Sequence, residues 1–330
     1  MIDDEYICLF GKDRAGPGPV TVDISTIFYE ISGSCNGGCR YCSTGGGSFD
    51  GCRWRYLPPG EFDRGIERLT DLGFLRDRVY LGLYSWGEPF LNPRIDEILL
   101  NLHKRGQSYA LSTNGSKYLP LPEKYFETLQ HIRFSLHGFS QKSFQRINRL
   151  SFEAVRGNID KWLDILPSGA VEICFFLYRF NYEDLLSAHD YFSDRGVSFH
   201  VNMPFIADFF SSIGYVTGNL DEQTRAAVDR DIETDHILDL LKTKPDGYIC
   251  PHQTSQLALD EFSNVLTCCA ISKKSAFYTI GSLFDLSRDE IIQAKKNVPL
   301  CSGCTKIGTP YWKTHARELL PVFIGQNFTR

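Results

Sequence analysis

Three cysteines within eight residues constrain this chain more than any other feature of its sequence. The stretch "SGSCNGGCRYCSTGGGS", residues 32–48, places Cys35, Cys39 and Cys42 at the spacing C-x3-C-x2-C. Such a group can form disulfides, hold zinc, or hold an iron–sulfur cluster. Structural zinc takes four protein ligands and catalytic zinc takes three, often with histidine, which this loop lacks. Iron–sulfur clusters are held by cysteine thiolates, and three thiolates leave one iron open to a further ligand.

Charge and hydropathy argue against a nucleic-acid-binding, membrane-spanning or secreted protein. The formal net charge of -5 argues against binding of duplex nucleic acid, which needs a basic surface. No apolar run approaches the roughly 20 residues that cross a bilayer. The N-terminus, "MIDDEYICLF", lacks the basic segment of a signal peptide. We therefore expect a cytoplasmic protein that binds neither nucleic acid nor membrane. In a reducing cytosol, its 11 cysteines indicate metal or redox chemistry.

Short β-rich runs alternate with helical stretches from residue 21 onward. The expected strands are 21–31, 78–86, 108–115, 131–138, 170–178 and 197–206, and the expected helices are 58–74, 92–106, 122–130, 151–166 and 182–196. This alternation predicts right-handed βαβ units with a parallel sheet. Six units predict an α/β fold with a partial (β/α)6 TIM-type barrel. Its site would lie at the carboxyl ends of the strands.

The pattern changes after Ile206. Residues 207–219 are expected to be a loop, 220–243 a long amphipathic helix, and the segment from Pro245 less regular. We predict an N-terminal extension over 1–20, a barrel domain over 21–215 and a cysteine-rich C-terminal domain over 216–330.

A second group of cysteines lies in this C-terminal part. Cys250, Cys268, Cys301 and Cys304 make a complete set of four thiolates for zinc or for an iron–sulfur cluster, and spacing alone does not choose between them. Cys269 directly follows Cys268. The remaining cysteines, which belong to neither group, are Cys8, Cys52 and Cys174.

The first cysteine loop, with an aromatic residue before its third cysteine, resembles the radical S-adenosylmethionine (SAM) superfamily. That resemblance implies a 4Fe–4S cluster on Cys35, Cys39 and Cys42, with SAM bound to the open iron. Further motifs, "WGEP", "STNG", "SLHG" and "SFQRIN", follow in the order of the family, the first three at strand ends. The residues implied to bind SAM are Tyr41, Gly87, Glu88, Thr113, Asn114, Ser135 and Arg146. The resemblance covers about residues 21–206.

The C-terminal cysteines resemble the twitch domain, a shorter form of the SPASM domain. Within that family, the resemblance implies one auxiliary 4Fe–4S cluster on Cys250, Cys268, Cys301 and Cys304. A full SPASM domain would carry a second auxiliary cluster and about seven cysteines, whereas this segment has five.

The implied reaction begins when an electron, from a flavodoxin- or ferredoxin-type donor, enters the first cluster. SAM is then cleaved to methionine and a radical that abstracts a substrate hydrogen atom. We predict an epimerase in which Cys269 returns hydrogen to the opposite face of the carbon, although a buried spare thiol is the simpler interpretation of Cys269. The alternatives are a dehydrogenase of a secondary alcohol, sulfur insertion from the auxiliary cluster, and a binding module without catalysis, which would not need an open iron.

The expected substrate is a small polar natural product, such as an amino sugar, an aminoglycoside or a nucleoside-like molecule. The segment "RFSLHGFSQKSFQRINRLSFEAVRGNI" is similar to barrel segments of SPASM-type proteins that act on sugars. Peptide-modifying relatives often carry a further N-terminal domain, for which we expect no room in the first 20 residues. A peptide substrate, and with it a peptide epimerase, remains the alternative.

Overall fold

A single sheet of nine strands forms the centre of the molecule. The computed structural model describes residues 21–45, 50–204, 206, 209–235, 237–271 and 273–316, so the expected extension over 1–20 and Cys8 lie outside the described residues. The strand order is β6-β5-β4-β3-β2-β1-β7-β8-β9. All pairs from β6 to β7 are parallel, and β8 and β9 are added antiparallel. The fold is therefore α/β with a mainly parallel sheet, as expected.

Each of the six expected strand ranges overlaps a strand, usually a shorter one, and β4 begins two residues before its expected range. These strands are β1 Thr26–Tyr29, β2 Tyr80–Gly82, β3 Tyr109–Thr113, β4 Leu129–Leu136, β5 Val171–Phe176 and β6 Ser198–Asn202. Along β4 the side chains alternate between half-buried and fully buried. His131, Arg133 and Ser135 are on one side, and Ile132, Phe134 and Leu136 pack in the core. Alternation of this kind places the polar set on the concave side of the sheet.

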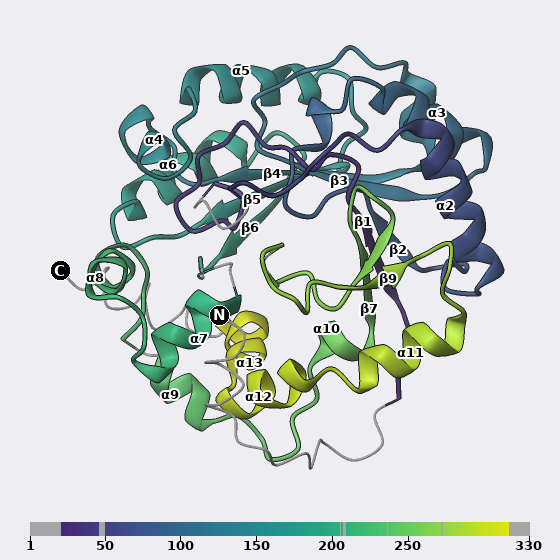
Figure 1. Ribbon diagram of the computed structural model, residues 1–330. Coiled ribbons are helices and arrows are strands. Elements are labelled where there is room, and N and C mark those ends of the chain that lie inside the picture. The colour runs from purple at the N-terminus through teal and green to yellow at the C-terminus, as the bar shows by residue number, and fades with distance from the viewer. Residues whose placement is uncertain are drawn as a thin grey trace.

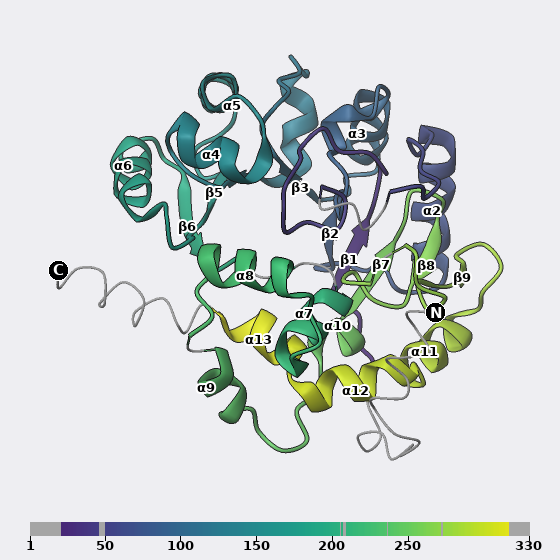
Figure 2. The same ribbon diagram turned by 60° about the vertical axis from the view of Figure 1, so that its left-hand side comes forward.

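Five helices lie along the outer side of the curved sheet (Figures 1 and 2). They are α2 Pro59–Asp71, α3 Ile95–Lys104, α4 Gln141–Asn148, α5 Phe152–Leu163 and α6 Tyr182–Phe192. Helix α2 begins with a proline at its first turn, where no amide donor is needed. It buries Phe62, Ile66 and Leu69 on one face, the spacing of an amphipathic helix on a core.

The helical stretch expected around 122–130 is present as the short 3-10 helix η2, Glu123–Thr128, and residues 129 and 130 begin β4; a second such turn, η1, covers Pro89–Leu91. Two other local predictions were wrong. The expected loop 207–219 contains the helix α7, Phe209–Thr217. The expected long helix 220–243 is two helices, α8 Glu222–Asp231 and α9 Ile237–Lys242. Helix α8 stops because Ile232 adopts extended backbone angles, φ -104° and ψ 143°.

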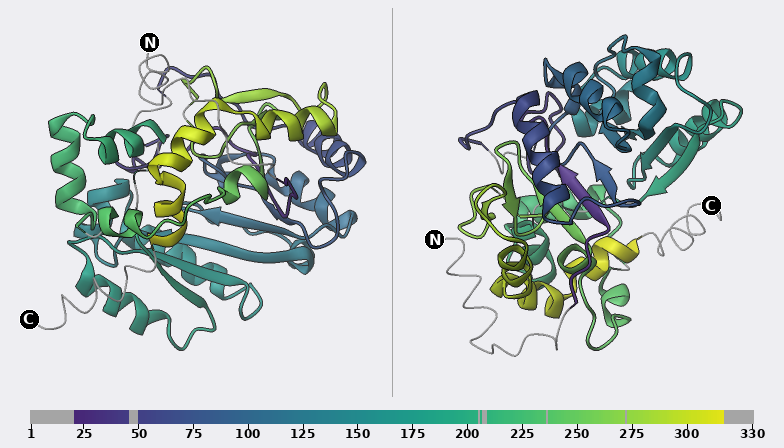
Figure 3. Two further views of the ribbon diagram at one scale, coloured as in Figure 1. Left: turned by 90° about the horizontal axis from the view of Figure 1, so that it is seen from below. Right: turned by 90° about the vertical axis from the view of Figure 1, so that its right-hand side faces the viewer.

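The C-terminal part continues the same sheet. Its elements are β7 Gln256–Leu259, β8 Asn264–Leu266 and β9 Thr279–Ser282, with helices α10 Pro251–Thr254, α11 Arg288–Lys296, α12 Pro299–Ile307 and α13 Thr309–His315. Strand β7 pairs with β1 in parallel, with Thr26 opposite Gln256. Figure 3 shows α12 and α13 on the opposite side of the sheet from α2–α6. The domain boundary near residue 216 stays a prediction, because strands from both sides of it share this sheet.

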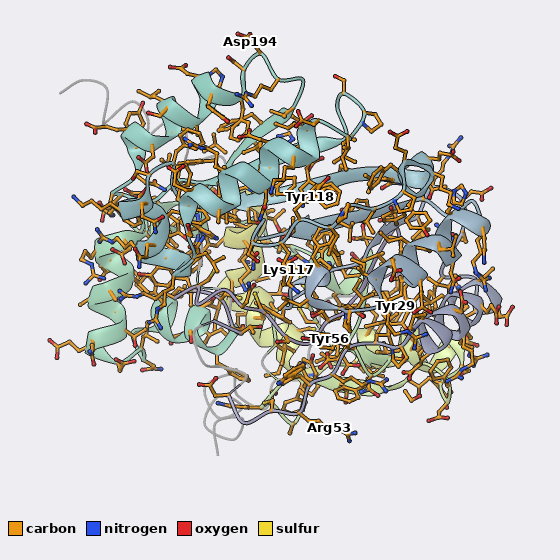
Figure 4. The ribbon with its side chains drawn as sticks, turned by 90° about the horizontal axis from the view of Figure 1, so that it is seen from above. Tyr29, Arg53, Tyr56, Lys117, Tyr118 and Asp194 are labelled. Atoms are coloured by element: carbon orange, nitrogen blue, oxygen red, sulfur yellow. The ribbon has the colours of Figure 1, made fainter. Side chains whose placement is uncertain are left out.

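Polar contacts in the interior join the first strand to the C-terminal part. The Tyr29 ring is fully buried, and its hydroxyl lies 2.7 Å from Ser263 Oγ. In Figure 4, Tyr29 lies within the mass of side chains, whereas Arg53 and Asp194 lie at opposite edges. Arg68 on α2 donates to the carbonyl oxygens of Leu283 and Leu286, at 3.3 Å and 2.9 Å. None of the helices in the described part of the chain is long and apolar enough to cross a membrane.

Candidate functional site

The carboxyl ends of the parallel strands surround an open cavity of about 420 Å³. Cys35, Cys39 and Cys42, from the loop after β1, line this cavity. A Cβ placed on Gly37 would lie 3.5 Å from Cys35 Sγ and 3.6 Å from Cys39 Sγ, so the missing side chain leaves space between these two sulfurs. We refer below to the whole cavity of about 420 Å³ as the large cavity.

The three thiols of this loop are protonated near pH 7 unless a metal centre binds them. Burial raises the pKa of the Cys35 thiol to about 12, and burial likewise raises the pKa values of the Cys39 and Cys42 thiols. Thiolates, not thiols, bind metal, so a bound cationic centre is what would deprotonate them here. No three Cys, His, Asp or Glu side chains of the described residues converge on a single ion. Three cysteine sulfurs along the wall of an open cavity are a donor set that suits an iron–sulfur cluster.

Glu88 joins the ends of β2 and β3 beside the cysteine loop. Its Oε1 accepts from Thr113 Oγ1 at 2.7 Å, and its Oε2 accepts from the Asn114 amide at 2.7 Å. Asn114 Nδ2 in turn lies 3.6 Å from Cys35 Sγ. Burial raises the pKa of Glu88 to about 7, although these hydrogen bonds oppose the shift. The side chains that sequence motifs nominated at two strand ends are therefore one hydrogen-bonded group.

Gly87 is required by the close approach of two loops. A Cβ at this position would collide with the carbonyl oxygen of Ser32. The same contact is secured by the buried Glu30, which accepts from the Trp86 amide at 2.6 Å and from the Gly87 amide at 3.1 Å. The "WGEP" motif thus has a structural requirement, a glycine against the cysteine loop, in addition to its implied role.

Several cavity residues were not found from the sequence. Ser135, which was expected, lines the cavity. His137, two residues further and directly after the end of β4, lines it as well. Burial lowers the pKa of His137 to about 4, so the ring is neutral near pH 7, and its Nδ1 lies 3.0 Å from the Tyr178 hydroxyl. The period of two along a strand could have found His137 from Ser135. The other unexpected lining residues include Tyr84, Trp86, Phe176, Tyr178, His252 and Lys313.

Tyr41 and Arg146 both contact the buried carboxylate of Asp231. The Tyr41 hydroxyl donates to Asp231 Oδ2 at 2.8 Å, and Tyr41 lines the large cavity. Arg146 forms an ion pair with Asp231 and lies over the Phe180 ring, 4.0 Å from its centroid. Arg146 is not among the residues that line the cavity, so its expected contact with SAM stays a prediction.

The second cysteine group surrounds a small, separate cavity of about 40 Å³. Its lining includes all four expected residues: Cys250, Cys268, Cys301 and Cys304. Burial raises the pKa of the Cys250 thiol to about 11 and that of the Cys301 thiol to about 12. The donor set, four half-buried cysteines around one space, fits a fully liganded iron–sulfur cluster. We refer to this space as the four-cysteine cavity.

Cys268 and Cys269 are adjacent in the chain but line different cavities. Cys268 lines the four-cysteine cavity, whereas Cys269 lines the large one. The Cys269 thiol lies 3.3 Å from Gln256 Oε1, and His252 Nδ1 lies 2.8 Å from the same oxygen. A hydrogen bond from Cys268 lowers the pKa of Cys269 relative to a free thiol. His252, Ala270 and Lys313 line both cavities, so the two spaces share a wall.

Comparison with known proteins places the barrel in a family. Residues 29–192 match the family model described as "Radical SAM superfamily". The chain therefore carries a radical SAM superfamily domain and is an enzyme of that class. This class uses SAM and an iron–sulfur cluster, in agreement with the chemistry of the cysteine loop. No curated protein matches the chain.

Solved structures share the fold at low sequence identity. SuiB of Streptococcus suis, bound to its precursor peptide SuiA, is 12% identical with a TM-score of 0.60, over 87% of this chain and 71% of SuiB. SuiB bound to S-adenosylmethionine is matched over 65% of its own chain. The structure of anSMEcpe with bound AdoMet is 13% identical with a TM-score of 0.51, over 90% of this chain and 99% of that one. At these identities the similarity establishes the fold alone.

Proposed function

We propose that this chain is a radical SAM epimerase of a small polar molecule, in which Cys269 donates the returning hydrogen atom. The observation that carries this proposal is the separation of two adjacent thiols. Cys268 belongs to the four-cysteine cavity, and Cys269 is directed to the cavity of the SAM-binding residues. In this proposal, two adjacent residues join a second metal site to the space where substrate would react.

In this proposal, Cys35, Cys39 and Cys42 hold the first 4Fe–4S cluster, which together with SAM supplies a hydrogen-abstracting radical. The chain's own residues position SAM and exclude water. Glu88 is fixed by Thr113 and Asn114, and Gly87 allows the loop to approach the cysteines. The residues proposed to contact SAM are Tyr41, Gly87, Glu88, Thr113, Asn114, Ser135 and, from the surface side, Arg146.

Cys269 completes the reaction by breaking its S–H bond and forming a C–H bond on the opposite face of the substrate carbon. The sulfur must then regain one electron and one proton. An auxiliary 4Fe–4S cluster on Cys250, Cys268, Cys301 and Cys304 is the proposed electron source, since Cys268 is the neighbour of Cys269. His252, which shares the Gln256 oxygen with Cys269, is a titratable group on the common wall. A flavodoxin- or ferredoxin-type protein is the proposed external donor.

The large cavity supports a compact substrate with both polar and ring surfaces. Tyr84, Trp86, Phe176 and Tyr178 supply aromatic surface, and His137, His252 and Lys313 supply polar groups. Its volume of about 420 Å³ is within the range for a small ligand. We propose an amino sugar, an aminoglycoside or a nucleoside-like molecule. The similarity to SuiB with its precursor peptide makes a peptide the alternative substrate.

Turnover in deuterated water tests the role of Cys269. The reconstituted enzyme is incubated without oxygen with candidate substrates, and the product is analysed by mass spectrometry and NMR. Because a thiol exchanges with solvent, the inverted carbon should carry one deuterium. Cys269→Ala should lower product formation by at least about 100-fold, as expected for loss of a positioned hydrogen-transfer group, while SAM is still cleaved. Cys52→Ala, a thiol that lines neither cavity, is the matched control and should turn over normally.

Three results would contradict the epimerase. Full turnover by Cys269→Ala would remove Cys269 from the reaction. A product that has lost two hydrogens and contains no deuterium would indicate a dehydrogenase, and a product containing sulfur would indicate sulfur insertion.

A further inference from the structure

A buried lysine lies beside the four-cysteine cavity. Lys295, in the last turn of α11, has only 2% of its surface exposed. Its Nζ donates to the carbonyl oxygen of His252 at 3.3 Å, and its own carbonyl oxygen accepts from Gln253 Nε2 at 2.9 Å. His252 and Gln253 both line the four-cysteine cavity. Lys295 does not itself line the cavity, but its ammonium group lies behind the wall, on the backbone of a lining residue.

This ammonium has too few partners for a buried charge. It can donate three hydrogen bonds, and within the described residues it donates one, to the His252 carbonyl oxygen. No carboxylate of the described residues pairs with it; the groups whose negative charge would act on it are the thiols of Cys268, Cys301, Cys269 and Cys250, once they are deprotonated. A buried charge without compensation is unfavourable, and one long hydrogen bond does not offset its lost hydration. Negative charge on the cysteine sulfurs is therefore what can compensate the positive charge of the Lys295 ammonium.

We propose that Lys295 is the counter-charge of the auxiliary iron–sulfur site, and that its ammonium raises the reduction potential of that site. This inference rests on the proposed function, which places a cluster on Cys250, Cys268, Cys301 and Cys304. Net charge and hydrogen bonds to sulfur are the factors that set such potentials. A positive charge next to the sulfurs stabilises the reduced, more negative state. Lys295 is thus a positioning residue that adjusts electron flow to Cys269 without contacting substrate.

The test uses the full chain with Cys35, Cys39 and Cys42 replaced by alanine, so that the C-terminal group is the remaining expected iron site. In this background, Lys295→Met removes the charge and Lys295→Arg keeps it. Lys306→Met removes an exposed charge from α12, the helix that carries Cys301 and Cys304, and is the matched control. Iron content is measured, and the midpoint potential is obtained by redox titration followed by electron paramagnetic resonance.

The background chain should hold about four irons. Lys295→Met should shift the ratio of reduced to oxidised cluster about tenfold toward the oxidised form, which is about 59 mV for one electron. Lys295→Arg and Lys306→Met should keep the potential of the background chain. A merely structural role for Lys295 would leave the potential unchanged in a variant that still binds iron.

An unchanged potential in an iron-loaded Lys295→Met chain would overturn the inference. If Lys295→Met assembles no cluster, Lys295→Arg decides: recovery of iron supports a requirement for charge, and failure of both variants contradicts it. A background chain that binds no iron would instead disprove the auxiliary site itself, and with it the counter-charge, a result distinct from an unchanged potential.

Discussion

Two buried carboxyl groups, Glu30 and Glu88, fix the loops that carry the site. Glu30 accepts from the amides of Trp86 and Gly87, and Glu88 accepts from Thr113 and Asn114. Burial raises the pKa of Glu30 to about 8, with the nearby Glu261 adding to the shift, and that of Glu88 to about 7. These values lie above the ordinary pKa of 4.5, so both groups link stability to pH.

We predict that the free energy of unfolding decreases as pH rises from 4.5 to about 8. In this window the folded chain binds a proton at Glu30 that the unfolded chain has released, so raising the pH favours unfolding. The decrease should approach about 1.4 kcal/mol per pH unit for this group. Urea unfolding at about pH 5 and about pH 8 measures it. Glu30→Gln should flatten the dependence and the exposed control Glu123→Gln should not; equal slopes in all three proteins would contradict the prediction.

At the scale of single residues, the sequence predicted the polar groups at strand ends. It did not predict the residues from the C-terminal part that line the same cavity. Cys35, Glu88, Asn114 and Ser135 carry recognisable motifs, and all line the large cavity. His252 and Lys313 line it as well, but they come from helices far along the chain, where no local pattern identifies them. Their positions depend on long-range packing, which a motif does not encode.

At the scale of elements, helix α8 anchors the cysteine loop through its last residue. The Asp231 carboxylate is fully buried and pairs with Arg40 at 3.6 Å, with Arg230 at 3.0 Å, and with Arg146. Tyr41, beside Cys42, also donates to it. One side chain therefore connects α8, α4 and the loop after β1.

Asp231→Asn should destabilise the protein by about 1 to 3 kcal/mol, because the arginines and Tyr41 lose a charged acceptor. The loop should become more mobile, so iron bound by the chain should be lost faster to a chelator. Arg40→Gln removes one half-exposed partner and serves as the control, with a change below about 1 kcal/mol. Urea unfolding and chelator kinetics measure the two effects. Wild-type stability in Asp231→Asn would show that α8 does not anchor this loop.

The elements differ in how well the sequence predicts them. Helices α2, α3 and α5 were expected because proline at a start, glycine after an end and apolar spacing act locally. The break between α8 and α9 was missed, since the apolar pattern continues across it. Strand β7 was missed because it is four residues long and is specified by pairing with β1, from the other end of the chain. Contacts between distant segments decide such short strands.

At the scale of the whole molecule, the sheet brings the two cysteine groups to one region. The pairing of β1 with β7 places the loop after β1 near the segment that carries Cys268 and Cys269. The two cavities then share a wall formed by His252, Ala270 and Lys313. The sequence predicted the two groups of cysteines, but not the strand pairing that makes them neighbours.

The central claim is that the three-cysteine loop holds a cluster that cleaves SAM. The most direct measurement is anaerobic incubation of the reconstituted chain with SAM and a strong reductant, with methionine and 5′-deoxyadenosine quantified. The account predicts both products in equal amounts from a chain holding about eight irons, and none from Cys35→Ala. A chain that loads iron but leaves SAM intact, or that binds no iron without oxygen, would contradict it.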